Sequence, residues 1–193
     1  MQCTFFDRPI GATRAFSTRR FCSSRTRGAT GASLPTPGEH SGLRPYRPYN
    51  VNEEGVVLDY SVLITAAFEA RKSAYVPYSK FAVGAALLSV DGQIYLGCNI
   101  ENVTFTPTIC AERTAFFKAI SEDVREFTAI AVVGGLADLE EGQVDFCTPC
   151  GVCRQVMVEF CGSDFKIITA RSSDDWREYT LDQLLPEASK PKF

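Results

Sequence analysis

Two short stretches of sequence decide how this chain is interpreted: CAER at residues 110–113 and PCGVC at residues 149–153. The first places a carboxylate two positions after a cysteine, and the second places two cysteines with two residues between them. Catalytic zinc sites have three protein ligands and a fourth position open to water, and zinc accepts thiolate readily. We therefore predict one zinc ion per subunit, held by Cys110, Cys150 and Cys153.

Glu112 is the candidate proton carrier beside this metal. The only histidine, His40, lies far from both motifs, so Glu112 is the natural remaining base. Zinc lowers the pKa of bound water toward ~7, and a nearby carboxylate can move the proton. A Cys₃ ligand set that includes P-C-x-x-C, together with a glutamate that is not a ligand, is the signature of zinc-dependent nucleobase deaminases.

Each ligand motif opens a stretch with helical character. Residues 110–119 and 152–160 favour helices, and Pro149 with Gly151 marks the turn into the second. Free N–H groups at a helix N-terminus favour nearby negative charge, which offsets the charge of three thiolates. We expect Arg113 and Arg154, which directly follow the motifs, to hydrogen-bond the sulfur atoms from the second shell of the site.

The cysteines allow other interpretations. A lone C-x-x-C occurs in redox sites and as half of a structural zinc ribbon. Cys147 lies three residues before Cys150, so a structural cluster of Cys147, Cys150 and Cys153 is also an alternative. Eight cysteines in a chain of this length indicate metal binding in a reducing compartment rather than a disulfide scaffold. Cys98 and Cys161 are expected to be buried packing thiols.

The remaining patterns predict an α/β domain with helices packed on one central sheet. A helix capped by Asp59 or Ser61 is expected to bury a stripe with a spacing of four residues, and to end before Pro77. Asp91-Gly92 is a strong hairpin turn between two strands. The stripe consists of Val62, Ala66, Ala70 and Ala74, with Leu63 and Ala67 beside them, and the expected strands are 81–90, 93–98, 127–133 and 165–170.

Beyond the motifs, the chain resembles the short, homotetrameric cytidine deaminases over about residues 58–187. The resemblance is carried by residues 74–81, 83–87, 97–102, 110–115, 149–155 and 184–186. It implies a three-layer fold with a mixed five-stranded sheet and a zinc site between two helix N-termini. It also implies a homotetramer that hydrolyses cytidine and deoxycytidine to uridine and deoxyuridine plus ammonia, in pyrimidine salvage, with Glu112 as catalytic acid and base.

The same resemblance assigns the substrate contacts. Asn99 and Glu101 are assigned to the ribose hydroxyls, Phe81 to one face of the pyrimidine, and Ala111 and Phe105 to the substrate site. The family usually has tyrosine where Phe105 stands, in a loop that reaches the site of a neighbouring subunit. Its animal members often carry an aromatic residue shortly after the segment that matches residues 184–186, where this chain continues with residues 187–189.

Two rival functions can be weighed on the sequence. A deaminase of another aminopyrimidine, such as the antibiotic blasticidin S, is disfavoured because residues 99–102 are intact. A zinc-stabilised binding module, or an inactive relative, would have no use for Glu112.

The charge is unevenly spread along the chain. Residues 1–50 carry a net charge of +6 and the remainder carries −9. An acidic domain argues against a nucleic acid polymer as partner and suits a small nucleoside.

The sequence also predicts three regions: an N-terminal extension at 1–50, a deaminase domain at 55–188 and a tail at 189–193. Residues 14–21 resemble a mitochondrial presequence, being basic and rich in hydroxyl groups. The alternatives are a disordered extension and a start codon set too far upstream. Since no run approaches the ~18 apolar residues of a membrane helix, we expect a cytoplasmic protein, with mitochondria as the alternative through residues 1–38.

Overall fold

A computed structural model describes residues 49–52 and 55–189 of the chain. The expected targeting segment and nearly all of the expected N-terminal extension and C-terminal tail lie outside these residues. The description opens with an antiparallel pair that the sequence patterns had not indicated, β1 (Tyr49–Asn52) and β2 (Gly55–Leu58). Among the described residues, no helix is both long enough and apolar enough to cross a bilayer.

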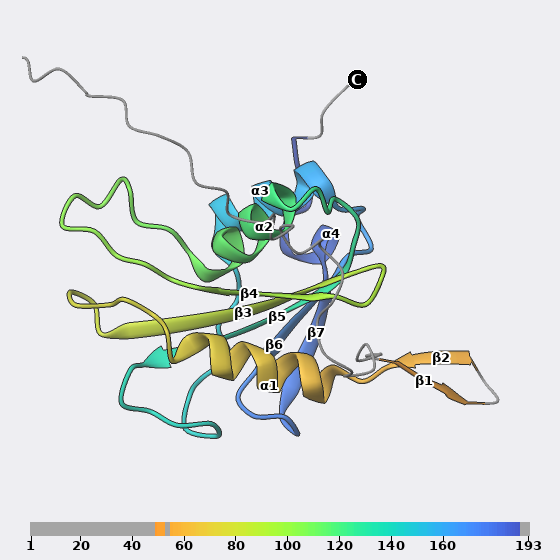
Figure 1. Ribbon diagram of the computed structural model, residues 1–193, viewed down its shortest axis with the longest axis horizontal. Helices are drawn as coiled ribbons and strands as arrows, with labels where there is room; N and C mark the ends of the chain where they lie inside the picture. Colours follow the sequence, from red (N-terminus) through yellow and green to blue (C-terminus); the bar gives the residue numbers. More distant parts are fainter. Residues whose placement is uncertain (1–48, 53–54, 190–193) are drawn as a thin grey trace, which may run out of the picture. The chain divides into compact units, whose positions relative to one another are not determined.

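The central sheet has five strands in the order β4-β3-β5-β6-β7 (Figure 1). Only β5 and β6 run parallel, so among the described strands the sheet is mixed, as predicted. The last strand could not be placed from the sequence because it lies at the sheet edge and none of its residues is buried. The bounds are β3 (Phe81–Ser89), β4 (Ile94–Cys98), β5 (Phe127–Leu136), β6 (Lys166–Ala170) and β7 (Trp176–Thr180).

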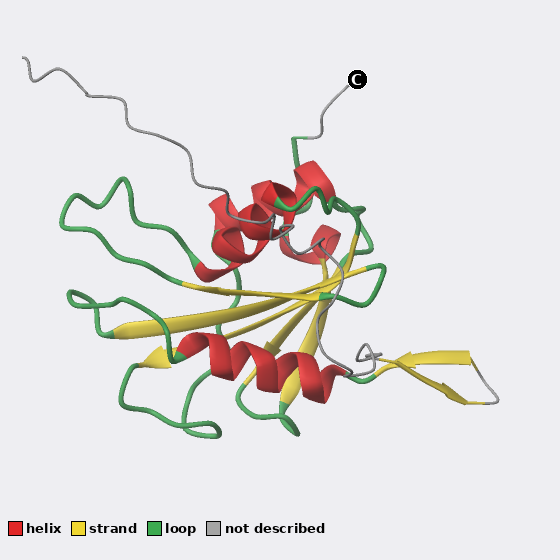
Figure 2. Cartoon of the chain, in the orientation of Figure 1, coloured by secondary structure: helices red, strands yellow, loops and turns green. Residues whose placement is uncertain are grey.

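Helices cover both faces of this sheet, which confirms the predicted three-layer α/β fold (Figure 2). One face carries α1 (Tyr60–Arg71), and the other carries α2 (Ala111–Ser121), α3 (Gly151–Phe160) and α4 (Leu181–Leu184). Neighbouring strand residues point to opposite faces. Thus Ala85 and Leu87 join the core under α2 and α3, whereas Ala86 and Leu88 join the core under α1.

The first helix corrects two expectations. Its Asp59 cap is as predicted and accepts a hydrogen bond from the Ser61 amide at 3.0 Å. The helix ends at Arg71, so Ala74 lies outside it, and Val62 and Ala66 are only half-buried. A spacing of four residues drifts around a helix that turns every 3.6 residues, and the larger apolar side chains take the sheet-facing side. The buried apolar face consists of Leu63, Ile64, Ala67, Phe68 and Ala70.

Helix α2, which begins directly after Cys110, packs closely on strand β4. A Cβ atom added to Gly97 would lie 2.2 Å from the carbonyl oxygen of Ala111 and 2.5 Å from the amide nitrogen of Ala115. Only glycine allows a backbone approach this close. Gly97 therefore sets the distance between the sheet and the first turn of α2.

Candidate metal centre and active site

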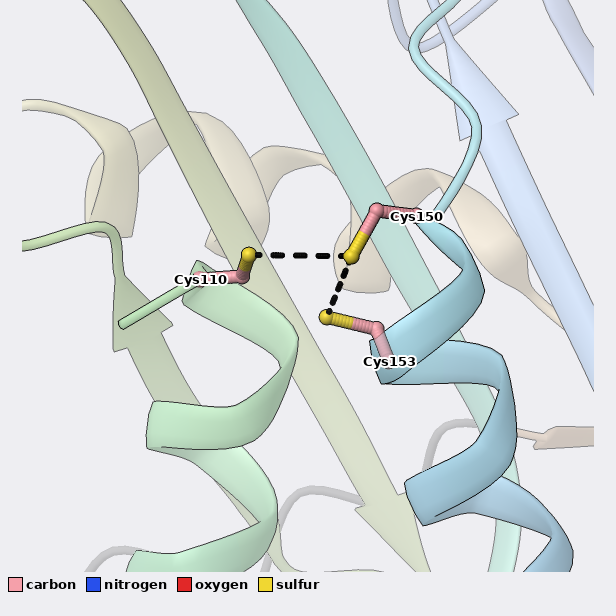
Figure 3. Close-up of side chains that lie close together, drawn as sticks. All are labelled: Cys110, Cys150 and Cys153. Carbon is pink, nitrogen blue, oxygen red and sulfur yellow. Dashed lines mark hydrogen bonds between the residues drawn. The ribbon is translucent and has the colours of Figure 1, made fainter. Parts of the chain in front are cut away.

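Three cysteine side chains meet where the N-terminal ends of α2 and α3 lie side by side (Figure 3). Cys110 and Cys150 are the N-cap residues of these helices, and Cys153 lies in the first turn of α3. The sulfur atoms of Cys110 and Cys150 are 3.9 Å apart, and those of Cys150 and Cys153 are 3.5 Å apart. All three cysteines are free, and these separations are far beyond a disulfide bond of about 2.05 Å.

This cluster fits zinc. Three sulfurs at about 2.3 Å from a tetrahedral zinc ion lie about 3.8 Å from one another, and the separations of 3.9 and 3.5 Å are close to that value. Soft thiolate ligands select zinc over harder cations such as Mg²⁺. The geometry thus agrees with the ligand set that the sequence predicts.

The electrostatics of the cluster also call for a cation. A hydrogen bond from Cys153, with a smaller effect of Arg113, lowers the pKa of the Cys110 thiol to about 5. The same hydrogen bond between Cys110 and Cys153, together with burial, strongly raises the pKa of the Cys153 thiol. One thiolate therefore forms easily and resists the ionisation of its neighbour. A bound metal cation would allow the three thiols to ionise together, because metal binding displaces thiol protons.

The backbone around the thiols supports negative charge. Neither Cys110 nor Cys150 makes a side-chain capping hydrogen bond within its helix. Each sulfur belongs to the residue at the positive end of a helix dipole, where thiolates are stabilised. Two helix N-termini thereby stabilise a set of three thiolates whose negative charge would outweigh the positive charge of the metal.

Glu112 lies in the first turn of α2 and is only 4% exposed. Burial raises the pKa of this carboxyl group above its usual value, against a smaller lowering by a backbone hydrogen bond. A buried carboxyl group that is not needed as a ligand and has a raised pKa is suited to accept and return a proton. This side chain supplies the acid–base function that a site for binding metal alone does not need.

The two arginines differ in their contacts. Arg113 donates from Nη2 to the sulfur of Cys110 at 3.4 Å, which is the expected type of contact. The expectation for Arg154 was wrong, because its guanidinium donates to the Pro149 carbonyl at 2.7 Å and the Leu184 carbonyl at 2.6 Å, with Thr148 as a further partner. Although Arg154 directly follows Cys153 in the sequence, its side chain contacts the loop before α3 and the end of α4.

Cys147 does not join the metal cluster. Among the described residues, the group able to hold a metal consists of Cys110, Cys150 and Cys153. The sulfur of Cys147 instead packs over Gly134, 2.8 Å from where a Cβ atom would stand, and burial raises the pKa of its thiol to about 11. The alternative of a structural cluster built on Cys147 is therefore not supported.

The other two cysteines of the domain are half-buried rather than fully buried. The thiol of Cys98 donates to the Ser73 carbonyl at 3.3 Å. Cys161 packs against the core under α2 and α3, and burial raises the pKa of its thiol to about 12. Both are distinct from the metal cluster.

The residues assigned to the substrate lie on three segments. Phe81 begins β3 and is 39% exposed, Ala111 is fully buried at the start of α2, and Phe105 is 82% exposed on the loop before α2. The Asn99 side chain accepts from the Val83 amide at 2.8 Å and donates to the Phe81 carbonyl at 2.9 Å.

Glu101 belongs to the same group but has partners that the sequence did not reveal. Its carboxylate accepts from the backbone amides of Tyr78 and Ser79, at 2.9 and 3.2 Å. A hydrogen bond from the Ser79 side chain is the largest cause of a lowered pKa for Glu101, with these two amides contributing. The only sequence signal near these partners is Pro77, which marks a turn.

Comparisons with known proteins agree with this site. The family model described as "Cytidine and deoxycytidylate deaminase zinc-binding region" matches residues 59–169. A cytidine deaminase of Sporosarcina psychrophila is 53% identical over 131 residues, which cover 68% of this chain and 91% of the relative. A cytidine deaminase of Halalkalibacterium halodurans is 50% identical over 131 residues, with 68% and 94% covered.

Solved structures show the same likeness. The crystal structure of cytidine deaminase from Burkholderia pseudomallei superposes with a TM-score of 0.60 at 43% identity, covering 66% of this chain and 97% of that one. The structure of cytidine deaminase from Mycobacterium tuberculosis gives a TM-score of 0.58 at 39% identity, covering 68% and 98%. The likeness thus spans nearly the whole of each relative.

Proposed function

The chain belongs to the cytidine and deoxycytidylate deaminase family, and from this premise we propose that it hydrolyses cytidine and deoxycytidine to uridine and deoxyuridine plus ammonia. The observation that carries this proposal is the three-thiol cluster with the buried carboxyl group of Glu112 in the same helical turn as Cys110. Pyrimidine salvage is the role that follows from such a reaction.

The residues of the site divide the chemistry among them. Cys110, Cys150 and Cys153 would hold one zinc ion, which supplies a water whose pKa is lowered toward ~7. Glu112 takes a proton from the attacking water as its oxygen adds to C4 of the pyrimidine, and passes that proton to ring N3. Glu112 then takes the remaining proton from the new C4 hydroxyl group and gives it to the amino group, so that C4 becomes a carbonyl as the C4–N bond breaks and ammonia leaves.

Arg113 supports this division of labour. Its guanidinium contacts the sulfur of Cys110 and stays positively charged at any working pH. It draws charge from the sulfur of Cys110, and this would keep a zinc ion held there a stronger acid. Arg154 acts at a greater distance, since it fixes the loop that delivers Cys150.

The substrate residues favour a nucleoside. The lowered pKa of Glu101 keeps its carboxylate ionised at neutral pH, and a carboxylate accepts hydroxyl hydrogen bonds but repels phosphate. The exposed ring of Phe81 offers an apolar surface to one face of the base. We therefore expect cytidine and deoxycytidine to react better than CMP, and free cytosine to bind weakly because it lacks the ribose.

One experiment tests the whole proposal. Purified protein would be analysed for zinc by mass spectrometry and for ammonia release from cytidine, deoxycytidine, CMP and cytosine. The expected result is about one zinc per chain and turnover of the two nucleosides. Bound zinc without ammonia release would instead indicate a binding module, and turnover led by CMP would contradict the nucleoside preference.

A further inference from the structure

Two segments that flank strands β3 and β4 are held together by both backbone and side-chain hydrogen bonds. The backbone amide of Tyr75 donates to the Asn99 carbonyl at 3.0 Å, and the amide of Glu101 donates back to the Tyr75 carbonyl at 2.9 Å. The side chains of Asn99 and Glu101 add the four contacts to residues 78–83 described above. We call residues 75–83 the Phe81 segment.

The Phe81 segment contains a strained residue. Lys80, which directly precedes Phe81, has φ of 58° in the left-handed region, and this conformation is unfavourable for a residue other than glycine. Such strain persists only where the surroundings impose it. Here the Lys80 amide donates to the Val76 carbonyl at 3.2 Å, and its carbonyl accepts from the Ala137 amide at 2.7 Å.

We propose that Asn99 and Glu101 are positioning residues for Phe81, holding its segment in the conformation that presents the aromatic ring to the pyrimidine. This inference rests on the proposed function and adds to the ribose contacts rather than replacing them. Asn99 keeps one free N–H and Glu101 keeps spare lone pairs for a hydroxyl group. Both residues therefore prepare the site before the substrate arrives.

The contacts of Glu101 are of a kind that matters energetically. Backbone N–H groups that donate to an ionised carboxylate make charge-assisted hydrogen bonds, which are about twice as strong as neutral ones. Without the carboxylate, the amides of Tyr78 and Ser79 lose this partner, and the segment can relax the strain at Lys80. The ring of Phe81 would then lose its fixed position.

A comparison of two substrates tests the idea with Glu101→Ala. 2′,3′-Dideoxycytidine lacks the 2′- and 3′-hydroxyls, so a residue that only binds those two hydroxyls cannot affect its binding. We expect kcat/KM to fall roughly 10- to 100-fold for dideoxycytidine as well as for cytidine, the range that follows from losing charged hydrogen bonds. The change should lie mainly in KM, since Glu112 and the thiols are untouched.

Hydrogen–deuterium exchange provides a test that needs no turnover. In Glu101→Ala, peptides that cover the Phe81 segment should exchange faster while zinc content stays unchanged. Glu101→Gln keeps one oxygen able to accept from both amides, so it should largely preserve protection and also serves if the alanine variant folds poorly. Asp174→Ala, which removes an exposed carboxylate in the turn before β7, is the matched control and should behave as wild type.

The outcomes separate this inference from the proposed function. A loss confined to cytidine, with unchanged exchange, would overturn the positioning role and leave the deaminase intact. If the wild-type protein released no ammonia from cytidine, the proposed function would fail. Exchange would still decide whether Glu101 orders the Phe81 segment.

Discussion

Among single residues, Glu112 has the most specific task, because one carboxyl group must both remove and deliver protons. Glu112→Gln preserves the shape of this buried side chain but cannot carry a proton. We expect the variant to keep its zinc and its thermal unfolding midpoint while kcat falls ~10²–10⁴-fold, the usual cost of a lost acid–base group. Zinc analysis, calorimetry and steady-state kinetics on the same preparation would check this, and near-normal turnover would refute the mechanism.

The metal ligands make a second prediction at the residue scale. Cys110→Ala, Cys150→Ala and Cys153→Ala should each lose zinc, because each removes one of three sulfurs within 4.8 Å of one another. Cys147→Ala should retain zinc, since its thiol packs on Gly134 instead. Metal content of the four purified variants gives the answer. An empty Cys147→Ala site beside a filled Cys110→Ala site would reverse the assignment.

Lys80 offers a test of local strain. Glycine adopts a φ of 58° at no steric cost, so Lys80→Gly should leave the free energy of unfolding unchanged or slightly increased. A β-branched residue is poorly suited to this conformation, and Lys80→Val should lose about 1–2 kcal/mol. Urea unfolding of both variants measures the difference. Equal stability of the two would show that this position carries no strain.

The single residues also show what a sequence can reveal. The zinc ligands were predictable because thiolate ligation imposes recognisable spacings on the chain. The partners of Arg154 and Glu101 were not, because they are backbone carbonyl and amide groups in loops. The positions of such groups depend on the folded path of the loops, which no residue pattern encodes.

The helices and strands also differ in how well the sequence predicts them. The metal motifs predicted the starts of α2 and α3, since the ligands themselves cap these helices. The central strands were predictable from their buried apolar runs. By contrast, no residue of β7 is buried, and the four-residue spacing expected for α1 matches its buried face only in part, because that spacing drifts around a helix with 3.6 residues per turn.

The close packing of α2 on β4 can be tested by substitution of Gly97. Gly97→Ala would place a methyl group 2.2 Å from the Ala111 carbonyl, so the helix must move outward. Overpacking of this kind costs about 1–3 kcal/mol, and the shift would also displace Cys110 from the other two sulfurs. We expect lower stability together with faster zinc loss to a chelator. Asp174→Ala, at an exposed position in the turn before β7, serves as control.

Considered as a whole molecule, a single chain leaves its site open to water. Cys150 is exposed, and the apolar side chain of Val152, which stands between Cys150 and Cys153 in the sequence, is 59% exposed. Electrostatic stabilisation in an active site strengthens when water is excluded. We therefore propose that neighbouring subunits close the site, in a homotetramer of the kind that the family resemblance implies.

Phe105 is the residue that should reveal this assembly. It is 82% exposed on the loop between Glu101 and Cys110, and buried aromatic anchors dominate interface energies. We expect Phe105→Ala to weaken assembly and raise KM together, because one side chain would serve both the interface and the neighbouring site. Val90→Ala, one residue beyond the end of β3 that lies opposite Phe81, should change neither. Light scattering at assay concentration measures assembly directly, and a fully active monomer would show that each chain closes its own site.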